Sequence, residues 1–144
     1  FEFLQQRDYT FSYKIIFLLA LLKHADKQGE ASLEDLTLSY QSFYMRLSKQ
    51  HGVVEKQNNP LNNIENIEDQ AYMQRSMLQN PFEKFERKRF MYQCKDLSMV
   101  SFDTVLWERL STSDLEAAKE QMISDGIAYF EKLGLELKPD DFAV

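Results

Sequence analysis

The sequence is poor in the residues that tie small folds together through covalent bonds or metal ions. It contains one cysteine, Cys94, which excludes an internal disulfide. Its two histidines, His24 and His51, are far apart in the chain, whereas a structural zinc site needs several clustered Cys or His ligands. We therefore expect no metal and no other cofactor. The scarcity of cysteine favours a reducing, cytoplasmic compartment.

Glycine and long apolar runs are also scarce. The four glycines stand singly, so no glycine-rich loop could cradle a phosphate group, and nucleotide hydrolysis is not expected. The longest apolar run, Ile15 to Leu22, spans eight residues, far below the roughly 20 that cross a bilayer. It lacks the basic start and the small-residue cleavage site of a signal peptide. We expect no membrane association and no small-molecule ligand.

The sequence does contain enough apolar material for one core. Of its 144 residues, 44% are hydrophobic and 13% aromatic, and a chain of this length buries roughly two thirds of its unfolded surface. Only three prolines interrupt it, which is typical of a folded, mainly helical domain. We predict one domain over residues 1–134 and a C-terminal tail over residues 135–144. Because the chain opens on Phe1 and not on Met, we also expect it to be a piece of a longer protein.

Helical spacing of the apolar residues predicts two long helices in the first half of the chain. Residues 12–26 are almost continuously apolar, so this helix should be buried at the centre of the domain. Gly29 in "DKQGE" is available for a left-handed stop. In "SLED", Ser32 and Asp35 have the spacing of a capping box, which predicts a second helix as far as about Ser48.

A loop and two further helices are expected next. Residues 51–63, "HGVVEKQNNPLNN", are rich in Asn and predict a loop. A third helix follows over about residues 67–79. Asn80 and Pro81 suit the N-cap and first position of a new, short helix, "PFEKFERKRF", because the residue before a proline avoids the helical region.

The period of the pattern then changes from 3.6 to 2. Phe90, Tyr92 and Cys94 alternate with their neighbours, "KDLS" supplies turn residues, and the alternation resumes at residues 100–102, which indicates a hairpin. "DTVLWERL" predicts a brief helix, and "TSDLE" a capping box of Ser113 and Glu116 before a long final helix that ends at about residue 133. The fold class is mainly α with a small β-hairpin and a long C-terminal helix.

Positive charge gathers where the short helix meets the hairpin. Between residues 83 and 95 the chain has five basic and two acidic side chains, and subtracting this +3 from the total of −6 leaves −9 for the remainder. One hypothesis is that these cations contact nucleic-acid phosphates. The alternative is a solvated helix face whose charges pair locally, as Glu83 and Arg87 could. The candidate nucleic-acid-binding residues are Lys84, Arg87, Lys88, Arg89 and Lys95.

Signals for catalysis are weak. "ERK" at Glu86 to Lys88 matches the acidic-x-Lys half of a metal-dependent nuclease site, but such a site needs a second carboxylate and normally a strand, whereas these residues fall in a predicted helix. His24 with Asp26, or His51 alone, could be a general base. No Ser or Cys sits in a nucleophile elbow. We therefore predict that the chain is not an enzyme and that its aromatic residues, which fall at helical spacings, form the core.

The order helix, helix, loop, helix and hairpin resembles a winged-helix domain over Tyr13 to Phe102. The connection between the second and third helices, roughly 18 residues, is longer than that of a compact helix-turn-helix. "SYKIIFLLALLKHADKQGEASLEDLTLSYQSFYMRL" followed by "NPFEKFERKRF" is also similar to winged-helix-like accessory modules of large bacterial restriction or phage-defence proteins, often beside helicase or nuclease domains. This resemblance implies a module that positions a larger protein on DNA. A protein-interaction or scaffolding domain, whose acidic surface and Asn-rich loop meet another subunit, is the second hypothesis.

Overall fold

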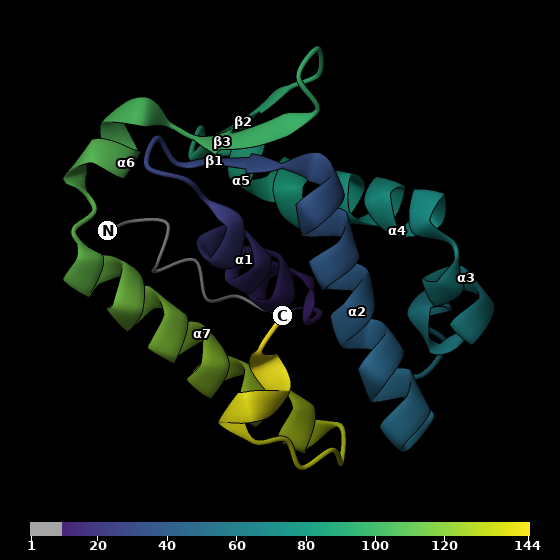
Figure 1. Ribbon diagram of the computed structural model, residues 1–144. Helices are drawn as coiled ribbons and strands as arrows, with labels where there is room; N and C mark the ends of the chain where they lie inside the picture. Colours follow the sequence, from purple (N-terminus) through teal and green to yellow (C-terminus); the bar gives the residue numbers. More distant parts are fainter. Residues whose placement is uncertain (1–9) are drawn as a thin grey trace.

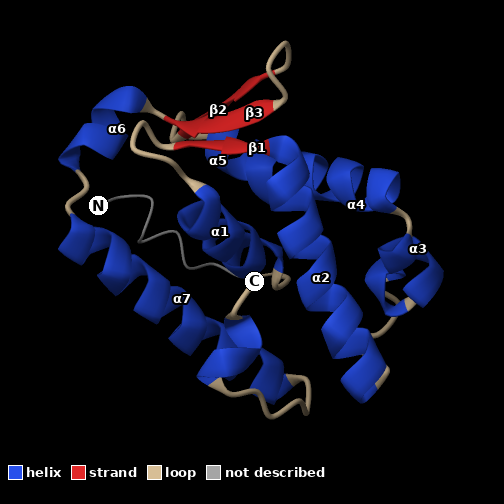
Figure 2. Cartoon of the chain, in the orientation of Figure 1, coloured by secondary structure: helices blue, strands red, loops and turns tan. Residues whose placement is uncertain are grey.

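The computed structural model describes residues 10–144. It is mainly helical, with a three-stranded antiparallel sheet at one end and a long C-terminal helix (Figures 1 and 2), which confirms the predicted fold class. The elements, in chain order, are α1 (Tyr13–His24), β1 (Glu30–Ser32), α2 (Leu33–His51), η2 (Pro60–Asn62), α3 (Ile64–Glu68), α4 (Gln70–Met77), η3 (Leu78–Phe82), α5 (Glu83–Arg87), β2 (Met91–Cys94), β3 (Met99–Phe102), α6 (Thr104–Arg109), α7 (Thr112–Lys132) and η4 (Pro139–Phe142).

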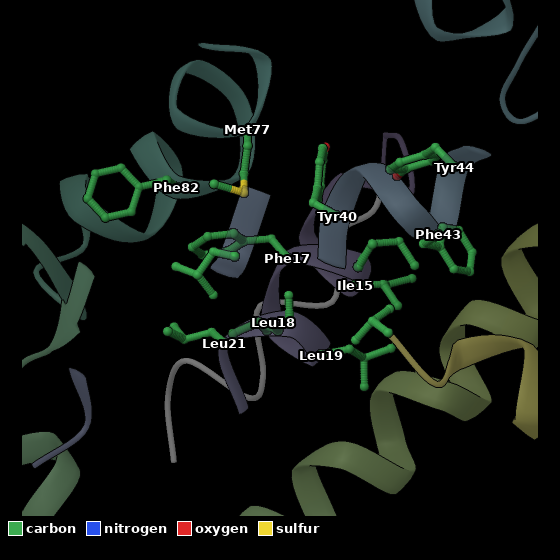
Figure 3. Close-up of a cluster of buried hydrophobic side chains, with 14 of the residues drawn as sticks. Ile15, Phe17, Leu18, Leu19, Leu21, Tyr40, Phe43, Tyr44, Met77 and Phe82 are labelled. Carbon is green, nitrogen blue, oxygen red and sulfur yellow. The ribbon is translucent and has the colours of Figure 1, made fainter. Parts of the chain in front are cut away.

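The first helix, α1, lies at the centre of the domain, as predicted. Figure 1 shows it between α2 and α7, with the sheet across one end. Every residue from Ile15 to Leu21 is buried, so this helix meets neighbours on all sides. Figure 3 shows Phe17 of α1 near Met77 and Phe82, while Phe43 lies on the α2 side of the same core. Burying each such side chain stabilises the fold by roughly 1.5–3 kcal/mol.

The start of α2 follows the predicted chemistry. The Ser32 side chain accepts a hydrogen bond from the backbone N–H of Asp35 at 3.4 Å, so it caps the helix. The helix runs three residues beyond the predicted end at Ser48 and stops at Gly52, which has a left-handed φ of 73°. Its buried face consists mainly of apolar residues at helical spacing: Leu33, Leu36, Tyr40, Phe43, Tyr44 and Leu47.

Strand β1 was not predicted. It pairs antiparallel with β3, and the strand order is β1-β3-β2, so the hairpin is extended by a third strand from between the first two helices. Gly29, directly before β1, is not a helix stop, since α1 ends at His24 and its C-cap residue, Ala25, is already extended. It has a φ of 79°, and a Cβ there would lie 2.6 Å from Cδ2 of Trp107. Glycine is therefore required by both the turn and the indole packed against it.

The predicted break at Asn80–Pro81 is wrong, because the helix continues through it. The elements α4, η3 and α5 follow one another without a gap, and η3 is a π-helical turn that contains Pro81. Proline has no N–H to donate and its ring collides with the carbonyl four residues earlier; the wider π-turn accommodates this. Asn80 is not an N-cap. Its side-chain amide instead donates to the carbonyl of Ser76 at 2.9 Å.

The Asn-rich connection is structured by its own side chains. Oδ1 of Asn62 accepts hydrogen bonds from the N–H groups of Val54 and Glu55 at 2.9 and 3.0 Å, and short helices η2 and α3 follow. The predicted third helix starts at Gln70, not at residue 67, because the Asp69 side chain caps α4 by accepting from a backbone N–H. The predicted loop is confirmed over residues 52–59, and these local bonds give it a defined conformation.

The last long helix, α7, begins two residues earlier than the predicted capping box. The box is formed by Ser111 and Asp114, whose side chains each accept from the other's backbone N–H at 3.1 and 2.9 Å, and not by Ser113 and Glu116. The predicted end at about residue 133 is confirmed: α7 ends at Lys132, and Gly134 follows with a left-handed φ of 85°.

Residues 135–144 do not leave the domain, so the prediction of an exit tail is corrected. They turn back through η4, and Phe142 is buried, with its ring centroid 5.6 Å from that of Phe43. Gly126 of α7 makes room for this ring, since a Cβ there would lie 2.5 Å from Cε1 of Phe142. The segment returns because Phe142 is apolar and α7 has an open position beneath it.

Candidate nucleic-acid interface

The candidate interface is the end of α5 and the hairpin that follows it. Only residues 88–90 separate the last residue of α5 from the first residue of β2. Figure 1 shows the β2–β3 turn projecting beyond the helices. The cations on α5 and on the hairpin are therefore carried by two elements that meet directly.

Aromatic side chains on the inner side of α5 fix it to the core. Phe82 and Phe85 are each 2% exposed. Both rings contact Phe17 of α1 with centroid distances of 6.2 Å, Phe82 edge-on and Phe85 stacked. On the other side of the junction Met91 is fully buried. The basic side chains between these anchors consequently face away from the core.

All five predicted cations are exposed. Arg87 is the one of them that forms an ion pair within residues 10–144, with Glu83 at 3.6 Å, and the two side chains are 66% and 51% exposed. An ion pair this open is worth about 0.2–1 kcal/mol at most. Local pairing therefore applies to Arg87 alone, while Lys84, Lys88, Arg89 and Lys95 remain open to a ligand.

The junction itself is a tight left-handed turn. The N–H of Arg89 donates to the carbonyl of Glu86 at 2.9 Å, and the N–H of Phe90 donates to that of Phe85 at 3.0 Å. These two bonds form a Schellman motif, with Arg89 at the left-handed position, where its φ is 62°. The turn redirects the chain from helix to strand and leaves the Arg89 side chain where α5 and the hairpin meet.

The hairpin turn is held at both ends. The N–H of Ser98 donates to the carbonyl of Lys95 at 3.2 Å, and the carbonyl of Ser98 accepts from the N–H of Leu33 at 2.8 Å. This second bond ties the turn to the start of α2. Leu97, at the tip, is 67% exposed. Asp96 beside Lys95 partly offsets the positive charge of the turn.

The sequence interpretation missed part of the exposed face. Because α4, η3 and α5 are continuous, the exposed side chains of Arg75 and Gln79 lie on the same helical segment as the cations. The expected break at Asn80 separated them from the basic cluster. Helical periodicity continued across Pro81 would have joined them.

The catalytic alternatives gain no support from the geometry. Glu86 and Lys88 lie on the exposed side of α5, and within residues 10–144 no group of three or more His, Cys, Asp and Glu side chains could hold a metal ion. His24 bonds to Oγ of Ser39 at 2.7 Å, and burial lowers its pKa. Asp26 accepts from two backbone N–H groups of the turn before β1. His24 and Asp26 thus make hydrogen bonds that stabilise the local fold.

A buried carboxylate, Glu55, was also missed. It is 1% exposed, and its Oε2 accepts from the N–H and Oγ of Ser12 at 2.8 and 2.7 Å. Its Oε1 accepts from the hydroxyl of Tyr129, whose pKa is raised first by burial and then by this carboxylate. The Ser12 hydroxyl also bonds to that of Tyr44 at 2.7 Å. This network joins α1, α2, α7 and the connection, and its burial marks it as structural.

Comparison with known proteins supplies no further guide: no family model, curated protein or solved structure matches the chain. Across the part of the chain that the structure describes, none of the helices has both the length and the apolar character to span a bilayer. The candidate interface therefore depends on its own geometry.

Proposed function

We propose that the chain is a non-catalytic module that binds nucleic acid. The observation that carries this proposal is the exposure of a set of cations on a helix end and a projecting hairpin that meet directly and are anchored to the core. The contact residues are Lys84, Arg87, Lys88, Arg89 and Lys95.

The projecting hairpin at the end of an exposed helical segment supports a winged-helix-like mode of binding. In such a mode the helix approaches a groove of duplex DNA while the hairpin contacts the backbone. We further propose that the module is cytoplasmic and positions a larger bacterial protein, as in restriction or phage-defence systems.

The size of the cluster sets the expected strength of binding. A cluster of +3 on a chain of −6 attracts phosphates only locally, so binding should be weak at physiological salt and strong at low salt. If all five cations contact phosphates of duplex DNA, the logarithm of the affinity should fall with the logarithm of the salt concentration with a slope of about −4.5.

The Asn-rich connection gives little support to the protein-interaction hypothesis. The side chain of Asn59 bonds to Tyr13 and to the N–H of Leu61, that of Asn62 to the connection's own backbone, and that of Asn63 caps α3. These amides are occupied within the domain. A protein partner would have to use other surface residues, such as the exposed Asn58 of the same connection.

Fluorescence anisotropy with a labelled DNA duplex tests the proposal. At low salt the wild-type chain should bind, and the triple variant Arg87→Glu, Lys88→Glu, Arg89→Glu should lose at least tenfold in affinity. The matched control reverses three exposed cations elsewhere, Lys49, Arg109 and Lys132. Both variants change the net charge by the same amount, so equal losses, or absence of wild-type binding at low salt, would refute the site and favour a protein partner.

A further inference from the structure

Arg89 occupies the left-handed position at a helix end, where α2 and α7 have glycine; away from helix ends, Asn58 and Ser98 also have a positive φ. At the end of α7 the N–H of Gly134 donates to the carbonyl of Glu131, and the next N–H donates back to Phe130, both at 2.9 Å. At the end of α5 Arg89 makes the same pattern of bonds, at 2.9 and 3.0 Å. The φ angles are 85° and 62°. The two turns are thus the same motif, one with glycine and one with arginine.

Arginine is strained in this conformation. In the left-handed region the Cβ of any residue other than glycine approaches its own carbonyl oxygen too closely, so glycine is the usual choice. The α2 helix also ends in a left-handed glycine, Gly52, with a φ of 73°. The fold therefore tolerates at Arg89 a backbone strain that it avoids at two other helix ends.

No contact within the described part of the domain compensates for this strain. The Arg89 side chain is exposed, and it forms no hydrogen bond or ion pair within residues 10–144. Arg87, in contrast, pairs with Glu83. Backbone strain that no internal contact offsets is a reason to look for a function of the side chain.

We propose that Arg89 is a principal ligand-binding residue of the interface, at which the domain sacrifices stability for contact with a phosphate group. This inference rests on the proposed function. The left-handed turn places Arg89 between the end of α5 and the hairpin, so a nucleic-acid backbone that contacts both elements would pass this residue. Arginine suits this place because its planar fork can donate two hydrogen bonds to one phosphate, which lysine cannot do.

The test compares stability and binding in the same variants. Arg89→Gly should raise the melting temperature by roughly 2–4 °C, because it relieves the strain, and should weaken duplex binding at low salt by roughly tenfold, because it removes a charge-assisted hydrogen bond. Arg89→Lys should leave the melting temperature close to that of the wild type and bind with intermediate affinity, since it retains the charge but not the fork.

Gly134→Arg is the matched control. It places arginine in the same motif at the other end of the domain, so it should lower the melting temperature by a similar amount without the loss of DNA binding.

Two results would overturn the inference while leaving the proposed function intact. In the first, Arg89→Gly is no more stable than the wild type. In the second, Arg89→Gly is more stable but binds DNA as well as the wild type does, while the triple charge reversal loses binding. Absence of wild-type binding at low salt would overturn both.

Discussion

Phe85 stacks on Phe17, with ring planes inclined by 25°, and this contact fixes the helix that carries the cations to the helix at the centre of the core. The position of the exposed face of α5 therefore depends on the packing of its buried face. Lys84, Arg87 and Lys88 can approach a ligand together only because the aromatic side chain between them is held.

Replacing Phe85 with Ala should therefore affect both stability and binding. The cavity should reduce the free energy of unfolding by roughly 3–5 kcal/mol, measured by urea denaturation. DNA binding should weaken even where the variant is still folded, because α5 loses its fixed orientation. Phe85→Leu, which fills most of the space, should lose much less of both. Full binding by a folded Phe85→Ala variant would show that the anchor does not position the cations.

Gly29 and Gly52 allow backbone strain to be separated from steric collision. Both have a left-handed φ, but a Cβ at Gly29 would meet Trp107 at 2.6 Å, whereas nothing lies within 4 Å of one at Gly52. Gly52→Ala should cost about 1 kcal/mol of unfolding free energy from strain alone. Gly29→Ala should cost roughly 2–4 kcal/mol, because the indole must also move.

Trp107 is the only tryptophan in the sequence, so its fluorescence should change in the native state of Gly29→Ala and stay unchanged in Gly52→Ala. Equal destabilisation by the two substitutions would contradict the close contact.

Buried tyrosines should make the fold sensitive to alkaline pH. Burial raises the pKa of Tyr40, Tyr44 and Tyr129 above the usual value of 10.0. Above pH 10 the unfolded chain loses these protons while the native state keeps them, so stability should fall as the pH rises. The slope approaches about 1.4 kcal/mol per pH unit for each such tyrosine.

Urea denaturation between pH 8 and pH 11 measures this slope. Tyr129→Phe removes one of the titrating groups and should give a shallower decline, although it also leaves Glu55 without one of its hydrogen bonds and should lower stability at pH 8. A decline of the same steepness in the variant would show that Tyr129 ionises as easily in the native state as in the unfolded chain.

Local signals in the sequence predicted the elements that depend on neighbouring residues. Ser32 caps α2 and Gly134 ends α7, because a cap needs only the backbone beside it. The alternation around Tyr92 predicted the hairpin because its two strands are neighbours in the sequence. The predicted cations are exposed as a solvent-facing helix requires, and their contact with nucleic acid stays a prediction.

The features that were missed depend on residues far apart in the chain. Strand β1 is three residues long and exists because β3 offers an edge to pair with. Phe142 was predicted to lie in a tail, because the sequence does not show that Gly126 of α7 leaves room for its ring. Pro81 was interpreted as a break because its usual effect is local, whereas packing of Phe82 and Phe85 on Phe17 favours a continued helix.

The π-turn at Leu78–Phe82 also determines which way the side chains of α5 point. A turn of this kind contains about one residue more than an α-helical turn, so each residue after it lies about 100° from the position that an uninterrupted α-helix would give it. If the same residues formed an ordinary α-helical turn, Phe85 would instead point away from Phe17 and the cations would point toward a different part of the surface. The direction in which the cations point is therefore set by the number of residues in this one turn and not by the cations themselves.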